Sequence, residues 1–271
     1  MRLVALLIFT FWGCDSAFEQ AKAVNSTNVP NSIIWHWEDD FSEKEQKRLI
    51  SYFTEVTEAT YKVLGKYPFK VHYFLHRSDS DQEPIPWAHT ERSEVQGVHF
   101  HVCTDFDESA FRADWAAPHE ISHLSIPFLG KENAWFSEGY ATYMQLQIMK
   151  EMEIYTNIEI EERYAMKDQL VAVDFVDEKP FLEDVLGQRA SYNFPAMYWG
   201  SVRYFKKINE QLVEHEQISL NQHIKTYQKM NRLKDESFKD LLHSLDAELK
   251  KPIFMNLYDR CCKESFFHAF E

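Results

Sequence analysis

Apolar and polar positions follow a helical period over the first well-patterned segment of the chain. The segment opens on Ser42-Glu43-Lys44-Glu45, a pattern typical of a capping box, and it ends near Gly65 and Pro68. Between these limits one helical face carries the apolar residues Leu49, Ile50, Phe53, Val56 and Tyr61. The pattern therefore predicts one helix between these limits.

Two later segments show the two-residue period of β-strands. Phe69–His76 and Val95–Cys103 alternate bulky and polar residues, and a polar, proline-containing connection at 78–86 separates them. We expect both segments to share one small sheet.

Helical spacing returns after residue 114 and dominates the rest of the chain. A short helix should begin between Asp114 and Ala117 and end before Pro127, since Pro118 is tolerated in a first turn. A loop at 128–132 leads to a helix over about 133–153, and further helices are predicted near 196–213, 218–230, 237–249 and 252–263. We therefore expect one domain over 32–271, with an α/β half at 32–130 and a helical half at 131–271.

Composition and charge indicate a folded domain with a large core and argue against one class of function, nucleic-acid binding. The chain has 271 residues, 45% of them hydrophobic, which is enough material for a large core. Its formal net charge of −14 argues against nucleic acid as a partner, because such a partner needs a basic surface.

The N-terminus resembles an export signal. Arg2 precedes an apolar run over 3–12, which suits the hydrophobic part of a signal peptide and is too short to span a bilayer. Gly13-Cys14 resembles a bacterial lipobox, so we expect a lipid anchor at Cys14 and a protein of the cell envelope. Residues 1–23 would hold the signal and the start of a tether, and 24–31 a linker. Cleavage after Ala21-Lys22-Ala23, giving a periplasmic or secreted protein, is the alternative.

Three further cysteines suit an oxidising compartment. Cys103 could form a disulfide with either Cys261 or Cys262, but the odd number leaves the pairing open. Adjacent cysteines lack the spacer of a metal site, so we expect buried or bridged thiols.

The segment His119-Glu120-Ile121-Ser122-His123 carries the clearest chemistry. Residues four apart lie on one helical face, so both imidazoles can reach one ion. Glu138 follows His123 by fifteen positions and can supply a third ligand from a second helix. Because catalytic zinc commonly keeps three protein ligands and one position for water, the sequence predicts one Zn²⁺ per chain. Two histidines on an ordinary surface helix are the plainer interpretation.

Glu138 lies within Trp135-Phe136-Ser137-Glu138-Gly139, and this run resembles the second-helix motif of the glu-zincin metallopeptidases. The resemblance covers about residues 97–205 and is to compact members of the peptidase MA clan. It implies an α+β fold in which a small mixed sheet packs on the active-site helix and a mostly helical C-terminal subdomain follows. It also implies zinc-dependent hydrolysis of peptide bonds, with a peptide or protein as substrate.

The chemistry of a zinc hydrolase and the resemblance together suggest roles for the other residues at this site. Zinc lowers the pKa of its bound water, and Glu120 is placed to take the proton as the water attacks. Relatives supply an oxyanion donor from a downstream helix, for which Tyr198 is our first choice and Tyr192 our second. Position 142 is Thr where thermolysin has Asp, so the partner of the ligand histidines is left open among Asp105, Asp107 and Asp114.

The resemblance also implies a strand beside the metal that pairs with an extended peptide. Gly97, Val98 and His99 are the candidates, and the absence of a carboxylate there disfavours aminopeptidase specificity. His99 and His101 share one face of this strand, and we expect a surface role for them rather than a second metal pair.

Two functions remain from different classes. The first is a zinc metallopeptidase of the cell envelope. The second is a non-catalytic lipoprotein of zincin fold that binds peptides or envelope proteins in its cleft. The first is favoured, because a binding module has no physical need for Glu120 beside the ligands.

Overall fold

The computed structural model describes residues 32–234 and 236–271. The expected signal, the lipid-anchored Cys14 and the linker at 24–31 lie outside the described residues and stay predictions. Among the residues that the structure describes, no helix is long and apolar enough to cross a membrane.

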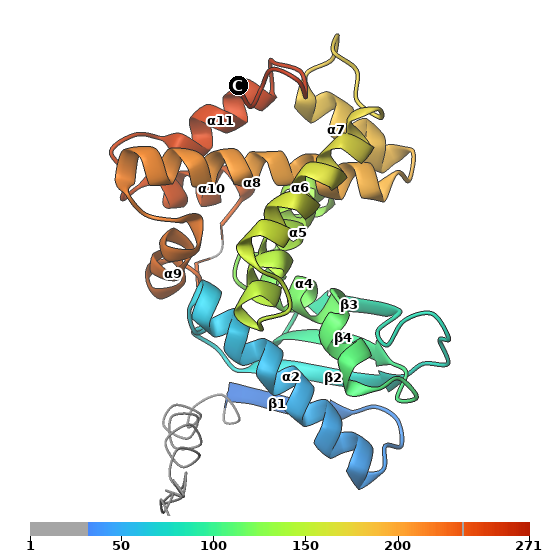
Figure 1. Ribbon diagram of the computed structural model, residues 1–271. Coiled ribbons are helices and arrows are strands. Elements are labelled where there is room, and N and C mark those ends of the chain that lie inside the picture. Colours follow the sequence, from blue (N-terminus) through green and yellow to red (C-terminus); the bar gives the residue numbers. More distant parts are fainter. Residues whose placement is uncertain (1–31, 235) are drawn as a thin grey trace, which may run out of the picture.

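A four-stranded mixed sheet forms the first part of the molecule (Figure 1). Its spatial order is β1 (Ile33–Trp37), β2 (Val71–Arg77), β4 (Gln96–Val102) and β3 (Trp87–Glu91). The first three strands run parallel, and β3 is antiparallel to β4. The prediction that the segments around β2 and β4 share a sheet is confirmed, and the two outer strands were not predicted.

Helix α2 (Glu43–Leu64) covers one face of this sheet. It begins with the predicted capping box, in which the Ser42 side chain accepts from Glu45 N and the Glu45 side chain accepts from Ser42 N. Its buried Phe53 packs against Tyr73 of β2 and Phe100 of β4. Burial of these aromatic rings fixes which side of the sheet faces the core.

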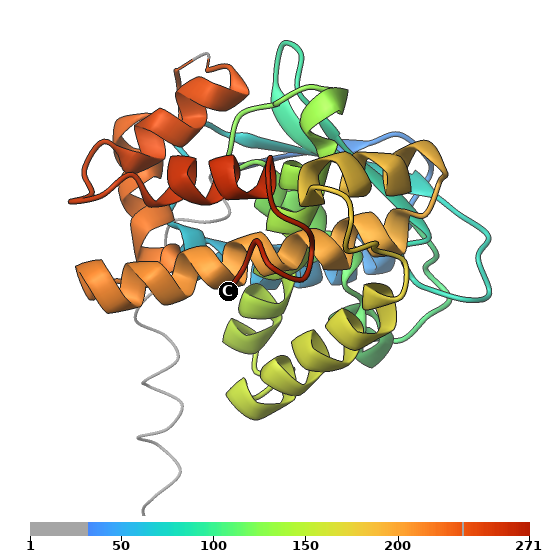
Figure 2. The ribbon, with the colours of Figure 1, turned by 90° about the horizontal axis from the view of Figure 1, so that it is seen from above.

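The remaining helices follow the sheet in sequence and make the protein mostly helical (Figures 1 and 2). They are α3 (Glu108–Ala113), α4 (Ala116–His123), α5 (Ala134–Glu151), α6 (Asn157–Ala172), α7 (Phe181–Ala190), α8 (Phe194–Glu216), α9 (Leu220–Met230), α10 (Phe238–Asp246) and α11 (Ile253–Cys261). A 3₁₀ turn, η2 (Lys131–Asn133), joins α4 to α5. The expected α+β class is thus observed, and α3, α6 and α7 are additions to the predicted helices.

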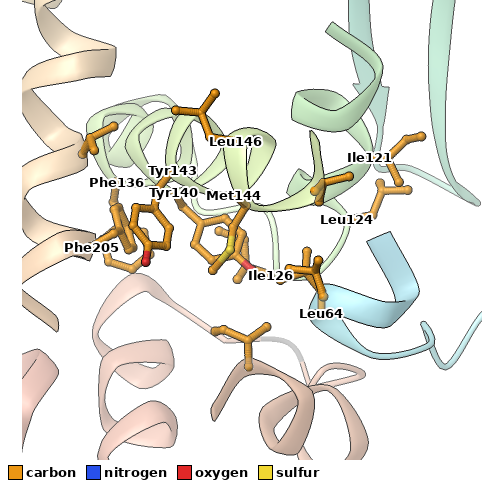
Figure 3. Close-up of a cluster of buried hydrophobic side chains, with 14 of the residues drawn as sticks. Leu64, Ile121, Leu124, Ile126, Phe136, Tyr140, Tyr143, Met144, Leu146 and Phe205 are labelled. Atoms are coloured by element: carbon orange, nitrogen blue, oxygen red, sulfur yellow. The ribbon is translucent and has the colours of Figure 1, made fainter. Parts of the chain in front are cut away.

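One core joins the two parts. Ile121 and Leu124 of the α4 segment belong to the same buried hydrophobic cluster as Leu64 of α2 and Met144 of α5 (Figure 3). The same cluster continues through Tyr140 to Phe205 of α8. A disulfide from Cys103 to Cys261 or Cys262 was considered from the sequence, but all three cysteines are free thiols.

Candidate metal centre

Helix α4 carries both histidines of the predicted metal site. Buried Asp114 accepts a hydrogen bond from Ala116 N (2.7 Å) at the helix start, and burial raises the pKa of this carboxyl to about 6. Pro118 occupies the first turn, where its missing N–H costs no helical hydrogen bond. The observed start and end agree with the predicted helix between 114 and 127.

The C-terminal end of α4 is closed by side chains from distant parts of the chain. Tyr67 donates to Ile121 O (2.6 Å), Arg232 donates to Leu124 O (2.8 Å) and Gln228 donates to Ser125 O (2.8 Å). Arg92 donates to His123 O, and burial lowers the pKa of its guanidinium to about 9. Helix ends leave carbonyls unpaired, so these donors fix the orientation of the whole helix.

Helix α5 brings Glu138 to the same place. Its first turn is anchored by Trp135 and Phe136, which are both buried and lie edge-on to Tyr204 of α8. Next to Glu138, Gly139 lets α5 approach α8 closely, since a Cβ at this position would lie 2.4 Å from Cβ of Ser201. In the Glu-Gly pair, close helix packing therefore accounts for the glycine, and the candidate metal site accounts for the glutamate.

Three potential ligand atoms converge between α4 and α5. His119 Nε2 lies 3.1 Å from Glu138 Oε2 and 3.2 Å from His123 Nε2, and the third side of the triangle, His123 Nε2 to Glu138 Oε2, measures 3.5 Å. A tetrahedral ion with bonds of about 2.0–2.1 Å separates its ligand atoms by about 3.3 Å. The spacing and the nitrogen and oxygen donor types suit Zn²⁺.

Glu120 also belongs to the cluster, because ligand atoms of His119, Glu120 and His123 all lie within 4.8 Å of one another. Two carboxylates thus stand near the two imidazoles. Glu138 Oε2 is within 3.5 Å of both nitrogens, which makes it the better third ligand. Glu120 then remains available for proton transfer.

The charges of the three side chains support one another. Burial alone would raise the pKa of Glu138, but attraction to His123 and hydrogen bonds from both histidines lower it well below its usual range. Burial would lower the pKa of His119, and the neighbouring Glu138 reverses that effect. Glu138 is therefore a carboxylate at all ordinary pH values, as a metal ligand must be.

The partner of His119 is Gln145, a residue that sequence reasoning missed. His119 Nδ1 lies 2.9 Å from Gln145 Oε1, so the amide oxygen can accept the outer N–H and orient the imidazole. The sequence left this role open among Asp105, Asp107 and Asp114, but the residue beside His119 Nδ1 is Gln145, and the carboxylates of Asp107 and Asp114 accept from backbone N–H groups of α3 and α4. The sequence did contain a signal for Gln145, because a residue seven positions after Glu138 lies on the same face of the helix.

A cavity of about 340 Å³ opens beside these residues. Glu120, His123, Glu138 and Tyr198 line it together with part of strand β3. Strand β3 also packs against α4 and forms one edge of the sheet. The cavity thus joins the candidate ligands, the candidate base and an open strand edge.

The assignment of Gly97, Val98 and His99 to peptide binding is corrected. All three lie in β4, where they pair with β2 on one side and with β3 on the other. Their backbone groups are therefore used within the sheet. The strand that lines the cavity is β3, whose short sequence gave no strong strand pattern.

Tyr198 and Tyr192 take different places. Tyr198 lines the cavity with its ring 5.9 Å from that of His119, whereas Tyr192 is 79% exposed and takes a left-handed backbone conformation before α8. Burial and the nearby carboxylates of Glu138 and Glu120 raise the pKa of Tyr198. Its phenol keeps its proton and can donate a hydrogen bond into the cavity.

No protein-family model and no curated protein matches this sequence. A mutant of a two-domain M1 zinc metallopeptidase bound to L-arginine matches the structure with a TM-score of 0.53 at 12% identity, over 88% of this chain and 50% of its own. The fold is similar to that of an M1 zinc metallopeptidase. A second such metallopeptidase, from Deinococcus radiodurans and bound to a Tyr-Ser-Ala substrate, gives 0.48 at 15% identity over 80% and 44% of the two chains. The present chain spans about half the length of these M1 metallopeptidases.

Proposed function

We propose that this protein is a zinc-dependent peptidase in which His119, His123 and Glu138 hold the ion. The triangle formed by their ligand atoms, with sides of 3.1, 3.2 and 3.5 Å, is the observation that carries the proposal. Gln145 orients one ligand, and the fold similarity to an M1 zinc metallopeptidase supports the assignment. Location in the cell envelope and lipidation at Cys14 stay predictions from the sequence.

Each cavity residue then has a role in hydrolysis. Zinc held there would polarise the scissile carbonyl and make the attacking water more acidic. Glu120 would accept the proton of that water at its carboxylate and later give it to the leaving amine. Tyr198 would donate its phenolic O–H to the carbonyl oxygen as negative charge develops there.

We propose that the backbone of the substrate binds along the edge of β3. Within the described residues, β3 has a strand partner on one side only, and Ala88, His89 and Thr90 line the cavity. An extended peptide can add to such an edge through main-chain hydrogen bonds. This replaces β4 in the role that the sequence suggested.

Glu120→Gln tests the chemistry. The amide keeps the size and hydrogen-bonding capacity of the side chain but takes up no proton, so turnover of a peptide library should fall on the order of a hundredfold or more. Glu132→Gln, which alters an exposed carboxylate just outside the cavity lining, should keep full activity. Cleavage by the Glu120 variant at the wild-type rate would exclude the proposed mechanism.

Metal analysis of the same proteins separates catalysis from binding. After desalting, the wild type and Glu120→Gln should each retain one tightly bound zinc, and Glu138→Ala should lose it. A wild type that binds zinc and peptides yet cleaves none under any condition would favour the non-catalytic peptide-binding alternative.

A further inference from the structure

The face of the sheet turned away from α2 carries half of the histidines in the protein. The sequence has 12 histidines, and strand register places six on this face: His36, His72, His76, His89, His99 and His101. The opposite face holds the aromatic contacts to α2. Sequence reasoning considered only two of the six, because the others come from strands far apart in the chain.

Two pairs on this face repeat one geometry. His76 Nε2 lies 2.9 Å from His99 Nδ1, and His36 Nε2 lies 2.9 Å from His72 Nδ1. In each pair the two residues are diagonal neighbours on adjacent parallel strands, with the same offset. Two imidazole nitrogens facing each other at this distance need only a small shift to reach the separation of about 3.3 Å that one tetrahedral ion imposes.

The pair formed by His76 and His99 has additional support. His89 stacks on His99 with ring centroids 4.7 Å apart, and its buried Nδ1 has no hydrogen-bond partner among the described residues. Glu91 Oε2 lies 3.8 Å from His99 Nε2, the nitrogen that points away from His76. A carboxylate near the outer nitrogen is the arrangement that orients histidine ligands at metal sites. His101 stacks on His76 at 4.6 Å.

We propose that His76 and His99 form a second, surface site for a divalent transition-metal ion, with water completing the coordination. Imidazole pairs of this kind suit Zn²⁺, Ni²⁺ and Cu²⁺ rather than Mg²⁺ or Ca²⁺. The site lies on the solvent-facing side of the sheet, and none of its ligands belongs to the candidate catalytic centre. It rests on its own observations and stands whether or not the protein cleaves peptides.

Calorimetric titration with Zn²⁺ tests the proposal. The wild type should bind more than one ion per chain, one of them tightly and another with affinity in about the micromolar range. His76→Gln combined with His99→Gln should reduce the count by one ion and leave the tight site intact. His243→Gln, which replaces an exposed histidine of α10, is the matched control and should leave the count unchanged.

A background with Glu138→Gln isolates the surface site from the candidate catalytic one. In this background the weaker ion should still bind. Changing His76 and His99 to Gln should then lower the affinity for this ion at least tenfold. Paramagnetic resonance of Cu²⁺ bound to the wild-type chain, with zinc in the tight site, should show nitrogen splitting from two imidazoles. Binding of a single ion by the wild type, or a copper spectrum without imidazole nitrogen, would overturn the proposal.

Discussion

At the scale of single residues, Tyr198 differs from other tyrosines of the chain in what its phenol faces. The chain contains 13 tyrosines, and buried ones such as Tyr67 and Tyr204 donate to backbone carbonyls. Tyr198 instead lines the cavity close to His119 and Glu138. Its raised pKa keeps the proton available where a transition state would place negative charge.

Tyr198→Phe should therefore lower kcat by roughly a hundred- to a thousandfold, in the range found for loss of one oxyanion donor, and should leave zinc content unchanged. Steady-state kinetics on one cleaved peptide measure the effect. Tyr192→Phe removes an exposed hydroxyl from the same helix start and should have no effect. Equal kinetics for the wild type and the Tyr198 variant would remove this residue from the mechanism.

Residues whose roles depend on spacing along one helix were predictable, and those whose roles depend on tertiary contacts were not. The helical period alone puts His119 and His123 on one face of a helix, with Glu120 beside them. Gln145 escaped notice because its partner lies on another helix. Gly97 to His99 were misplaced because only the complete sheet shows which strand is the edge.

At the scale of helices, the contact of α5 with α8 positions Glu138, the candidate third ligand. Gly139 sits at a close contact between the two helices, and a Cβ there would also lie 3.0 Å from the carbonyl carbon of Ser201. Any added atom must push α5 away from α8, and Glu138 is the preceding residue. The geometry of the metal site is therefore sensitive to this one position.

Gly139→Ala should destabilise the protein by about 1–3 kcal/mol and weaken zinc binding, because overpacking at a helix contact shifts the backbone. Denaturant unfolding and metal titration measure the two effects. Gly187→Ala in α7 is the matched control, since a Cβ there meets nothing within 4 Å and should stabilise the helix by up to about 1 kcal/mol. Similar behaviour of both variants would show that the close contact is unimportant.

Long elements with a clear apolar period were the predictable ones. Helix α2 and the helices α8 to α11 follow their sequence patterns closely. Helix α6 was missed because it buries only Ile160, Tyr164 and Val171, although its Thr156–Glu159 capping box was a usable signal. The five-residue strands β1 and β3 are too short to show a period, and pairing with their neighbours creates them.

At the scale of the whole molecule, the candidate ligands join the sheet-bearing part to the helical part. His119 and His123 come from α4, and Glu138 comes from α5. Their ligand atoms converge only in the folded chain. An ion held by all three side chains would therefore bind the native state more tightly than the unfolded one and stabilise it.

Removal of the ion by a chelator should lower the melting temperature by on the order of 5 °C or more, which corresponds to about 2.7 kcal/mol for free zinc at a hundred times its Kd. Scanning calorimetry with EDTA and with restored zinc measures the shift. The His76→Gln, His99→Gln double variant serves as the background, so that the sheet face does not contribute. In that background, Glu138→Gln should abolish the shift, and a shift that persists would place the stabilising ion elsewhere.

The hydrogen bonds to the carbonyls at the C-terminal end of α4 also bear on when, during synthesis, this end becomes ordered. The partners of Leu124 and Ser125, in and just after α9, lie 108 and 103 positions further along the chain. During synthesis, a nascent chain that has not yet reached α9 lacks the donors to Leu124 O and Ser125 O, although Tyr67 and Arg92, which donate to Ile121 O and His123 O, are already present. The end of α4 can therefore take its final form only after Arg232 has been synthesised, so a shorter nascent chain holds the candidate ligands less firmly in place.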